Sequence, residues 1–132
     1  MRILVVEDEP QLAGHVCRAL ARRGHAVSSE SDGSAGLTAA LKHPVDLIVL
    51  DLNLPKKHSQ AVLADIKSTP ELCRIPVVIF STSQARQDIV RSYELGANCY
   101  VSKPGNLTDF FSAIQSIEKF WFNFVNLPPR GE

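Results

Sequence analysis

Acidic side chains and a lysine follow three separate apolar runs of this chain. Glu7 and Asp8 come directly after the first run, Asp51 after the most hydrophobic one, and Lys103 after a later one. If the runs are neighbouring parallel strands, their carboxyl ends meet at one edge of a sheet, where open α/β sheets bind ligands. Carboxylates in contact repel one another, and one of them takes up a proton unless a cation neutralises the group.

This set of acidic and basic side chains is what we expect of a Mg²⁺ site that binds a phosphoryl group. Mg²⁺ is a hard cation held by one or two carboxylates together with waters and phosphate oxygens. Asp51, at the end of a rigid apolar strand, can act as the nucleophile because carboxylates form acyl phosphates. Lys103 supplies positive charge, and Ser81 or Thr82, after another apolar run, can donate a hydrogen bond to a phosphoryl oxygen. Phosphoryl transfer depends mainly on such positioning and charge neutralisation.

Each of these residues also has a purely structural explanation. An Asp after an apolar run is commonly a turn or cap residue, and the acidic triplet 7–9 before Pro10 is typical of a capped helix start. A Ser-Thr pair after a strand is commonly an N-cap. Four such signals at four strand ends of one short chain together favour the functional interpretation.

Alternating strands and helices must bring these residues together. Apolar runs predict five strands, at residues 2–6, 25–29, 45–50, 77–80 and 98–101. Helical spacing predicts five helices, from Pro10 to a stop at Gly24, from the Asp32-Gly33 turn to Lys42, and over residues 58–68, 85–95 and 107–121. In the fourth helix we expect Ile89 and Val90 to face inward, with Tyr93 as a third candidate. Five βα units with right-handed crossovers place helices on both faces of a parallel sheet.

Length, composition and charge restrict the class of protein. The 132 residues suffice for one domain, and 45% hydrophobic with 21% charged residues is ordinary for a globular protein. The 14 basic and 14 acidic residues cancel, which argues against broad binding to nucleic acid or a membrane surface. No apolar stretch reaches the roughly 18 residues of a membrane span. The first residues turn acidic too soon for a signal peptide, and the 3 cysteines form no disulfide framework. We expect a cytoplasmic protein.

The polar strand ends and their flanking residues resemble the receiver domains of bacterial two-component response regulators, including the chemotaxis-regulator-like single domains. The resemblance extends over essentially the whole chain and is carried by four segments, residues 3–10, 46–55, 75–82 and 96–104. It implies a flavodoxin-like (βα)5 doubly wound parallel sheet with strand order 2-1-3-4-5. It also implies a phosphoacceptor signalling domain rather than an enzyme, with only self-phosphotransfer and autodephosphorylation as its chemistry.

The same resemblance implies a role for each site residue. Asp51 takes the phosphoryl group from a phosphohistidine of a sensor histidine kinase. Ser81 is the switch hydroxyl, Lys103 the counter-charge of the phosphate and Tyr100 the aromatic switch, and the bond between Lys103 and Pro104 is cis. The implied ligands of Mg²⁺ are the carboxylates of Glu7, acting directly or through water, Asp8 and Asp51, and the main-chain carbonyl of Asn53.

A narrower resemblance covers the second half of the chain. It is to the small regulators paired with bacterial phytochromes, which are single domains that often dimerise and end in an aromatic, Leu-Pro-containing tail. It is carried by residues 51–57, 75–78, 81–83, 93–95, 98–100 and 120–121. The implied partner is a phytochrome-type histidine kinase.

The C-terminal segment predicts an interaction surface. Residues 120–127 are too aromatic to be buried entirely around one helix, and an exposed apolar patch indicates a partner or a homodimer. We expect a symmetric dimer through the last helix, the fifth strand and the helix before it. Its contacts are expected from Tyr93, Phe111, Phe120, Trp121 and Phe124. We expect one receiver domain over residues 1–132, with a core to about residue 121, a tail from about residue 120 and no output domain.

The sequence departs from the receiver pattern at two places. His58-Ser59 stands where the family usually has Asp-Gly, which predicts a differently shaped loop beside Asp51. Gly105 stands where many receivers have Phe, which removes an apolar contact at the start of the last helix.

Three other classes of protein fit the pattern less well. A phosphatase or phosphotransferase with an aspartyl-phosphate intermediate needs a second carboxylate two residues after the nucleophile, where this chain has Asn53. A flavodoxin needs a hydroxyl- and glycine-rich loop after the first strand, and the acidic residues 7–9 repel a flavin phosphate. A structural adaptor independent of phosphorylation does not need the intact acidic set and Lys103.

Overall fold

The computed structural model describes residues 1–52, 54, 59–103 and 107–121. Five parallel strands form one sheet in the order β2-β1-β3-β4-β5. The strands are β1 (Arg2–Val6), β2 (Ala26–Glu30), β3 (Leu47–Asp51), β4 (Val77–Ser81) and β5 (Cys99–Ser102). The predicted doubly wound sheet and its strand order are confirmed.

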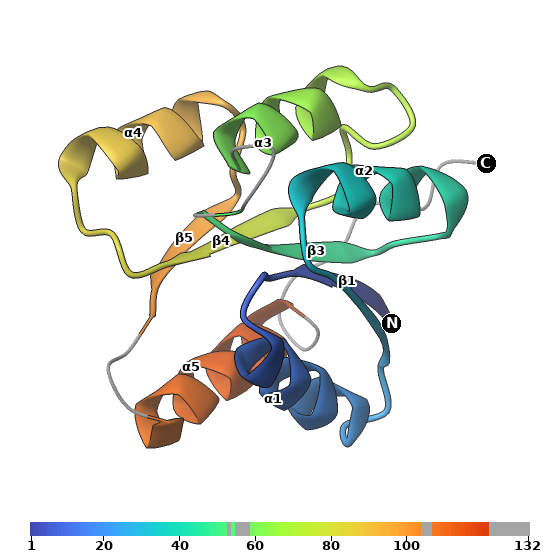
Figure 1. Ribbon diagram of the computed structural model, residues 1–132, viewed down its shortest axis with the longest axis vertical. Helices are drawn as coiled ribbons and strands as arrows, with labels where there is room; N and C mark the ends of the chain where they lie inside the picture. Colours follow the sequence, from blue (N-terminus) through green and yellow to red (C-terminus); the bar gives the residue numbers. More distant parts are fainter. Residues whose placement is uncertain (53, 55–58, 104–106, 122–132) are drawn as a thin grey trace.

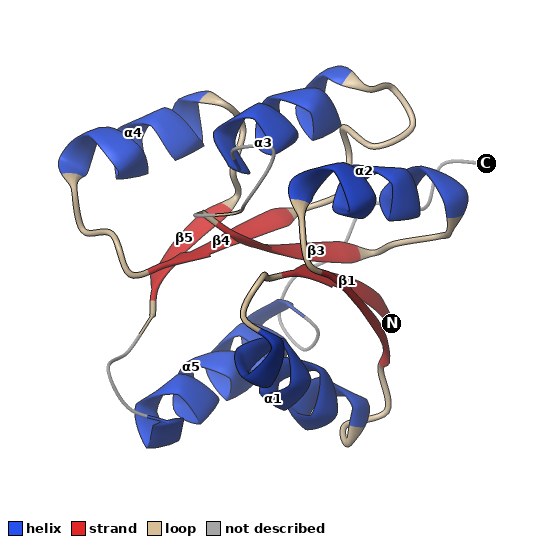
Figure 2. Cartoon of the chain, in the orientation of Figure 1, coloured by secondary structure: helices blue, strands red, loops and turns tan. Residues whose placement is uncertain are grey.

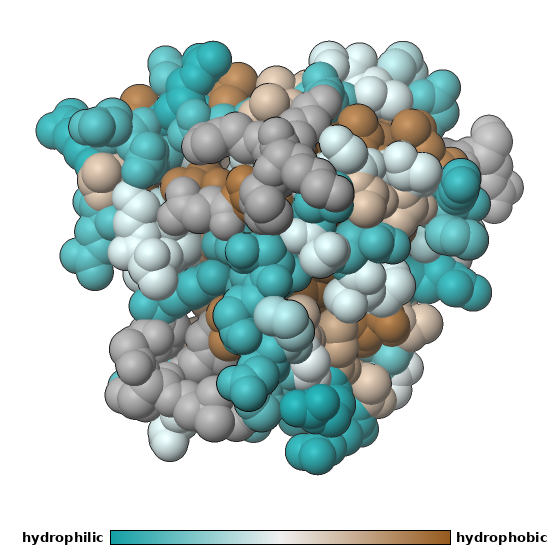
Figure 3. Space-filling model, in the orientation of Figure 1, coloured by the Kyte–Doolittle hydropathy of each residue, from teal (hydrophilic) through white to brown (hydrophobic). Residues whose placement is uncertain are grey.

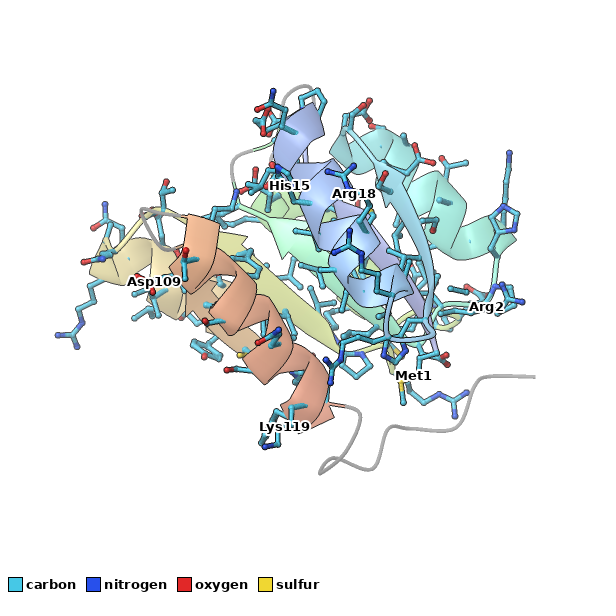
Figure 4. The ribbon with its side chains drawn as sticks, turned by 90° about the horizontal axis from the view of Figure 1, so that it is seen from below. Met1, Arg2, His15, Arg18, Asp109 and Lys119 are labelled. Atoms are coloured by element: carbon cyan, nitrogen blue, oxygen red, sulfur yellow. The ribbon has the colours of Figure 1, made fainter. Side chains whose placement is uncertain are left out.

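Helices cover both faces of the sheet. The helices are α1 (Pro10–Ala21), α2 (Gly33–Lys42), α3 (Ser59–Ser68), α4 (Arg86–Glu94) and α5 (Leu107–Lys119). Helices α2, α3 and α4 lie above the sheet and α1 and α5 below it (Figure 1). The sheet is a single layer between two helical layers (Figure 2), and seen from below α1 and α5 lie side by side (Figure 4).

Each face of the sheet buries its own hydrophobic cluster. In β1, Leu4 and Val6 belong to the cluster under α2 and α3, whereas Ile3 and Val5 belong to the cluster with α1 and α5. This alternation follows from the pleat of a strand, which points successive side chains to opposite faces. Strands β3 and β4 are buried at every position, so they appear in the sequence as continuous apolar runs.

Trp121, expected from the sequence on a dimer surface, instead lies in the core. Its side chain is 8% exposed and joins the cluster of α1 and α5, while the neighbouring Phe120 is 54% exposed. The two rings meet edge to face with centroids 5.6 Å apart. The two aromatic residues that directly follow α5 therefore point to different sides: the Phe120 ring faces outward and the Trp121 ring covers the core.

Capping accounts for one acid of the triplet after β1. The Glu9 side chain caps α1 and accepts hydrogen bonds from the main-chain N–H groups of Gln11 and Leu12. Pro10 then occupies the first helical turn, where its missing N–H costs nothing. The structural explanation thus holds for Glu9, and Glu7 and Asp8 remain as the acids that capping does not explain.

Helix α4 is rotated from the orientation that its apolar residues predict. Val90 and the third candidate, Tyr93, are 45% and 49% exposed, and the buried residue of this helix is Ser92. The Ser92 hydroxyl donates to the Asp88 carbonyl at 2.8 Å, and a serine satisfied in this way can be buried at little cost. The prediction for Val90 was wrong because apolar spacing alone does not reveal a satisfied polar residue.

The face of the molecule seen in Figure 3 is mostly polar among the described residues. Hydrophilic side chains dominate the face seen in Figure 3, with hydrophobic ones in separate small areas. None of the described helices is long and apolar enough to cross a membrane.

Gly36 sets how closely α2 approaches β1. A Cβ added at Gly36 would lie 2.8 Å from Cγ2 of Val6, so an alanine must displace the helix or the strand. We expect Gly36→Ala to lower the free energy of unfolding by about 1–3 kcal/mol despite the better helix propensity of alanine. Urea unfolding followed by circular dichroism measures this change.

Gly14→Ala in α1 is the matched control. Its nearest contact is the flexible end of the Arg18 side chain at 3.1 Å, so we expect unchanged stability or a gain of up to about 1 kcal/mol. Wild-type stability of Gly36→Ala would contradict the close contact between α2 and β1.

Candidate functional site

The acids after β1 and β3 meet at the carboxyl edge of the sheet. These strands are neighbours, with Val6 opposite Leu50, so Glu7 and Asp51 emerge side by side. Carboxylate oxygens of Glu7, Asp8 and Asp51 lie within 4.8 Å of one another. Glu7 and Asp51 are buried and Asp8 is exposed, so the acidic group opens to solvent through Asp8.

Lys103 reaches this group from the edge strand β5. Its main-chain N–H donates to the Ser81 carbonyl at 2.7 Å, which holds the residue beside the end of β4. Its ammonium group lies 2.7 Å from Oε1 of Glu7 and 3.0 Å from Oδ1 of Asp51. The structure therefore brings together Lys103 and the three acids that the sequence places at strand ends.

The floor of the site is apolar. A cavity of about 10 Å³ beneath the charged groups is lined also by Val5, Val16, Val49 and Phe80. Such a volume holds about one water molecule at most. The charged groups are therefore poorly hydrated from below, and their mutual interactions are correspondingly strong.

Burial and mutual contact shift the pKa values of two of these groups. Burial raises the pKa of Glu7 to about 7; the hydrogen bond from Lys103 opposes the rise and the neighbouring Asp51 adds to it. Burial works against the charged form of Lys103, but its contacts with Glu7 and Asp51 outweigh this and raise the pKa of the lysine. The lysine thus stays protonated, and Glu7 and Asp51 share its positive charge.

The serine that ends β4 lies next in the row of strand ends. Ser81 is fully buried, and its hydroxyl oxygen accepts a hydrogen bond from the Ser83 N–H at 3.0 Å. A hydroxyl that accepts one bond still has its own hydrogen to donate. Thr82, the alternative in the sequence, is exposed. The buried hydroxyl beside the acidic edge is therefore that of Ser81.

A series of hydrogen bonds connects Ser81 with α4 and β5. Besides its bond to Ser81, Ser83 accepts a bond from the Tyr100 hydroxyl at its carbonyl, at 2.9 Å. The Ser83 hydroxyl donates to Asp88 at 2.6 Å, and the Tyr93 hydroxyl accepts from the Tyr100 N–H at 3.1 Å. Sequence reasoning missed Ser83, whose only signal is its place two residues after Ser81.

Several predicted features fall outside the described residues or side chains and stay predictions. They are the Asn53 carbonyl, the Lys103–Pro104 bond, the loop changes at His58 and Gly105, and the side chains of Phe111 and Phe124.

The strand order and the acidic carboxyl edge of the sheet with its lysine are those of a receiver domain. Residues 3–115 match the response regulator receiver domain family, and the chain belongs to this family. Over 83 residues it is 54% identical to the response regulator Rcp1 of a Synechocystis species, an alignment that covers 63% of this chain and 56% of that protein. The chain spans about half the length of several other curated relatives that it matches.

Two solved structures match nearly the whole chain. One is the Mn²⁺-bound form of the response regulator Rcp1, with 42% sequence identity, a TM-score of 0.89 and coverage of 97% of this chain and 99% of that one. The other is the phosphorylated cyanobacterial phytochrome response regulator RcpA, with 42% identity, a TM-score of 0.90 and coverage of 97% and 98%. The predicted resemblance to receivers and to phytochrome-associated regulators is confirmed.

Lys103, whose side chain is 11% exposed, carries the positive charge between Glu7 and Asp51, so its removal leaves these two acids facing each other. We expect Lys103→Met to lower the free energy of unfolding by about 3 kcal/mol without divalent ions, because one partner of a buried pair is lost. Adding Glu7→Gln to this variant recovers part of the loss, since one carboxylate fewer remains. Urea unfolding of the single and double variants measures both effects.

Lys119→Met, at the exposed end of α5 (Figure 4), is the control and is expected to change stability by less than about 0.5 kcal/mol. An equal result for Lys103→Met would show that the buried contacts do not hold in solution.

Proposed function

We propose that Asp51 accepts a phosphoryl group from a phosphohistidine of a sensor histidine kinase. A carboxylate oxygen of Asp51 forms the new bond to phosphorus, the phosphorus–nitrogen bond breaks, and the histidine nitrogen takes up a proton. The observation that carries the proposal is the geometry around Asp51. This buried carboxylate ends a fully buried strand, 3.0 Å from the Lys103 ammonium and beside two further acids.

The acidic group fits a divalent cation, which we propose to be Mg²⁺. Its carboxylate oxygens are close enough to share one ion, and hard oxygen donors with open solvent access suit Mg²⁺. Glu7, Asp8 and Asp51 would hold the ion, together with the main-chain carbonyl of Asn53 expected from the family resemblance. When bound, the ion neutralises charge on the phosphoryl oxygens. The Mn²⁺ in the related Rcp1 structure supports this assignment.

The protein's own groups complete the chemistry of the site. Lys103 holds a positive charge beside the Asp51 oxygen, and Ser81 has a hydroxyl hydrogen to donate to the phosphoryl group. A phosphoryl group on Asp51 favours the state in which Ser81 binds it. Because Ser83 is bonded to both Ser81 and Tyr100, a shift of Ser81 changes the packing of Tyr100 and the surface of α4 and β5.

We further propose that residues 1–132 form a single receiver domain that acts in the cytoplasm as a signalling protein, not as an enzyme on other substrates. The full-length match to two solved receivers supports the single domain. The zero net charge supports protein partners rather than nucleic acid or membrane. The similarity to a cyanobacterial phytochrome regulator supports a phytochrome-type histidine kinase as the phosphodonor.

Asp51→Asn is expected to abolish labelling by acetyl phosphate in the presence of Mg²⁺, because the nucleophilic oxygen is gone. Intact-protein mass spectrometry detects the added phosphoryl group. Asp46→Asn, at the other end of the same apolar segment, is the matched control and is expected to be labelled like the wild type. Removing Mg²⁺ with a chelator is expected to stop labelling of the wild type. Labelling that persists in Asp51→Asn would place the nucleophile elsewhere.

Phosphotransfer to the wild type and to Asp46→Asn tests the identity of the kinase. A phosphorylated phytochrome-type histidine kinase is expected to transfer its label to the wild type and to Asp46→Asn faster than other histidine kinases of the source organism do. Equal or slower transfer would remove the phytochrome-type kinase and leave the phosphoacceptor role intact.

We propose that the surface of α4, β5 and the end of α5 forms a symmetric homodimer. On this surface Tyr93 and Phe120 are 49% and 54% exposed, and Val90 lies beside Tyr93 in α4. Light scattering at tens of micromolar is expected to show a dimer, and Tyr93→Glu to weaken it at least about tenfold. Leu41→Glu, at an equally exposed apolar residue of α2, is the control. A monomeric wild type, phosphorylated or not, would exclude the dimer.

A further inference from the structure

Ser59 makes a hydrogen bond that points back toward the candidate nucleophile. Among the described residues, three polar side chains have no exposed surface, and they belong to Ser59, Ser81 and Ser92. The hydroxyl of Ser59, the first residue of α3, donates to the main-chain carbonyl of Asp51, eight residues earlier. A serine at a helix start commonly accepts a bond from its own helix instead. Here the hydroxyl ties the helix to the strand that carries Asp51.

The hydrogen bond from Ser59 reaches β3 at its carboxyl end, next to the last main-chain hydrogen bond between β3 and β4. Asp51 is the last residue of β3, and the Leu52 N–H still donates to the Phe80 carbonyl at 3.2 Å. The direction of the Asp51 carbonyl depends on the ψ angle of Asp51, and the backbone angles determine which side-chain rotamers are allowed. Holding the carbonyl therefore restricts the carboxylate, which must stay 3.0 Å from the Lys103 ammonium.

We propose that Ser59 is a positioning residue for the phosphoacceptor Asp51. Its hydroxyl fixes the end of β3, so that the carboxylate is aligned before the phosphodonor arrives. The inference rests on the proposed function of Asp51. It also accounts for a departure noted in the sequence: serine stands where receivers usually have glycine, and glycine has no hydroxyl to donate.

The competing explanation is that Ser59 only stabilises the start of α3. A merely structural bond changes the stability of the protein but not the alignment of Asp51. Ser92 provides a matched comparison, because it too is fully buried and donates to a main-chain carbonyl, that of Asp88, at 2.8 Å. Alanine at Ser59 or at Ser92 removes the same kind of bond, and only the first touches Asp51.

The test measures phosphorylation by acetyl phosphate at saturating Mg²⁺ in the full chain. Ser59→Ala is expected to lower the maximal rate about tenfold, with the half-saturating donor concentration unchanged, because alignment rather than donor binding is lost. Ser59→Cys, of similar size and with a weak S–H donor, is expected to fall between wild type and alanine. Ser92→Ala is expected to stay within about twofold of the wild-type rate.

A second measurement needs neither metal nor donor. The ¹³C resonance of the Asp51 carbonyl is expected to move upfield in Ser59→Ala, because a carbonyl that loses its hydrogen bond is more shielded, and to stay in place in Ser92→Ala. This signal reports the contact itself. Should Ser59→Ala fail to fold, Ser59→Cys provides both measurements.

A wild-type rate in Ser59→Ala, or an equal loss in Ser92→Ala, would overturn the positioning role while leaving Asp51 as the phosphoacceptor. An unlabelled wild type would overturn the proposed function and the positioning role with it. An unchanged carbonyl resonance in Ser59→Ala would show that the hydroxyl does not hold Asp51.

Discussion

The contact on which this structure depends is the ammonium group of Lys103 shared between Glu7 and Asp51. The ammonium nitrogen of Lys103, just after β5, lies 2.7 Å from Glu7, which follows β1 and is 96 residues earlier in the chain. It lies 3.0 Å from Asp51, which ends β3 and is 52 residues earlier. Two nearly buried carboxylates above an apolar floor repel each other strongly without a positive charge between them. The lysine makes the acidic edge compatible with folding, and the remaining excess of carboxylate makes the same edge suited to a second cation.

The order of the strands turns this contact into a site. Because the sheet runs β2-β1-β3-β4-β5, the ends of β1, β3, β4 and β5 form one row that carries an acid, an acid, a hydroxyl and an ammonium. The chain reverses direction of winding at β1 and β3, and ligands of open α/β sheets bind at such a point. Buried β3 and β4 in the centre of the sheet give Asp51 and Ser81 a rigid origin.

The strands and the polar residues at their ends could be predicted from the sequence, because they show in its hydrophobic pattern and residue types. Continuous apolar runs predicted β3 and β4, and the polar residue after each run predicted the row of strand ends. The parts that could not be predicted are hydroxyl contacts, such as those of Ser59 and Ser83, which depend on which carbonyl the fold brings within reach. Val90 was misplaced for the same reason, since the satisfied hydroxyl of Ser92 takes the inner face of α4.

Helices α3 and α4, on the two sides of the site, differ in how much of each is buried in the core. This difference bears on which of them can shift when the site changes. On the side of α3, the Ser59 contact is fully buried, and Val62, Leu63 and Ile66 anchor the helix in the core. On the other side, α4 buries only Ser92, and the bonds that lead from Ser81 end at the half-exposed Tyr93. Elements with few buried apolar contacts open and shift at the lowest free energy. If Asp51 takes up the phosphoryl group as proposed, the added charge would be resisted by α3 and would displace the α4 and β5 side, so that one site would combine a firmly held acceptor with a movable surface.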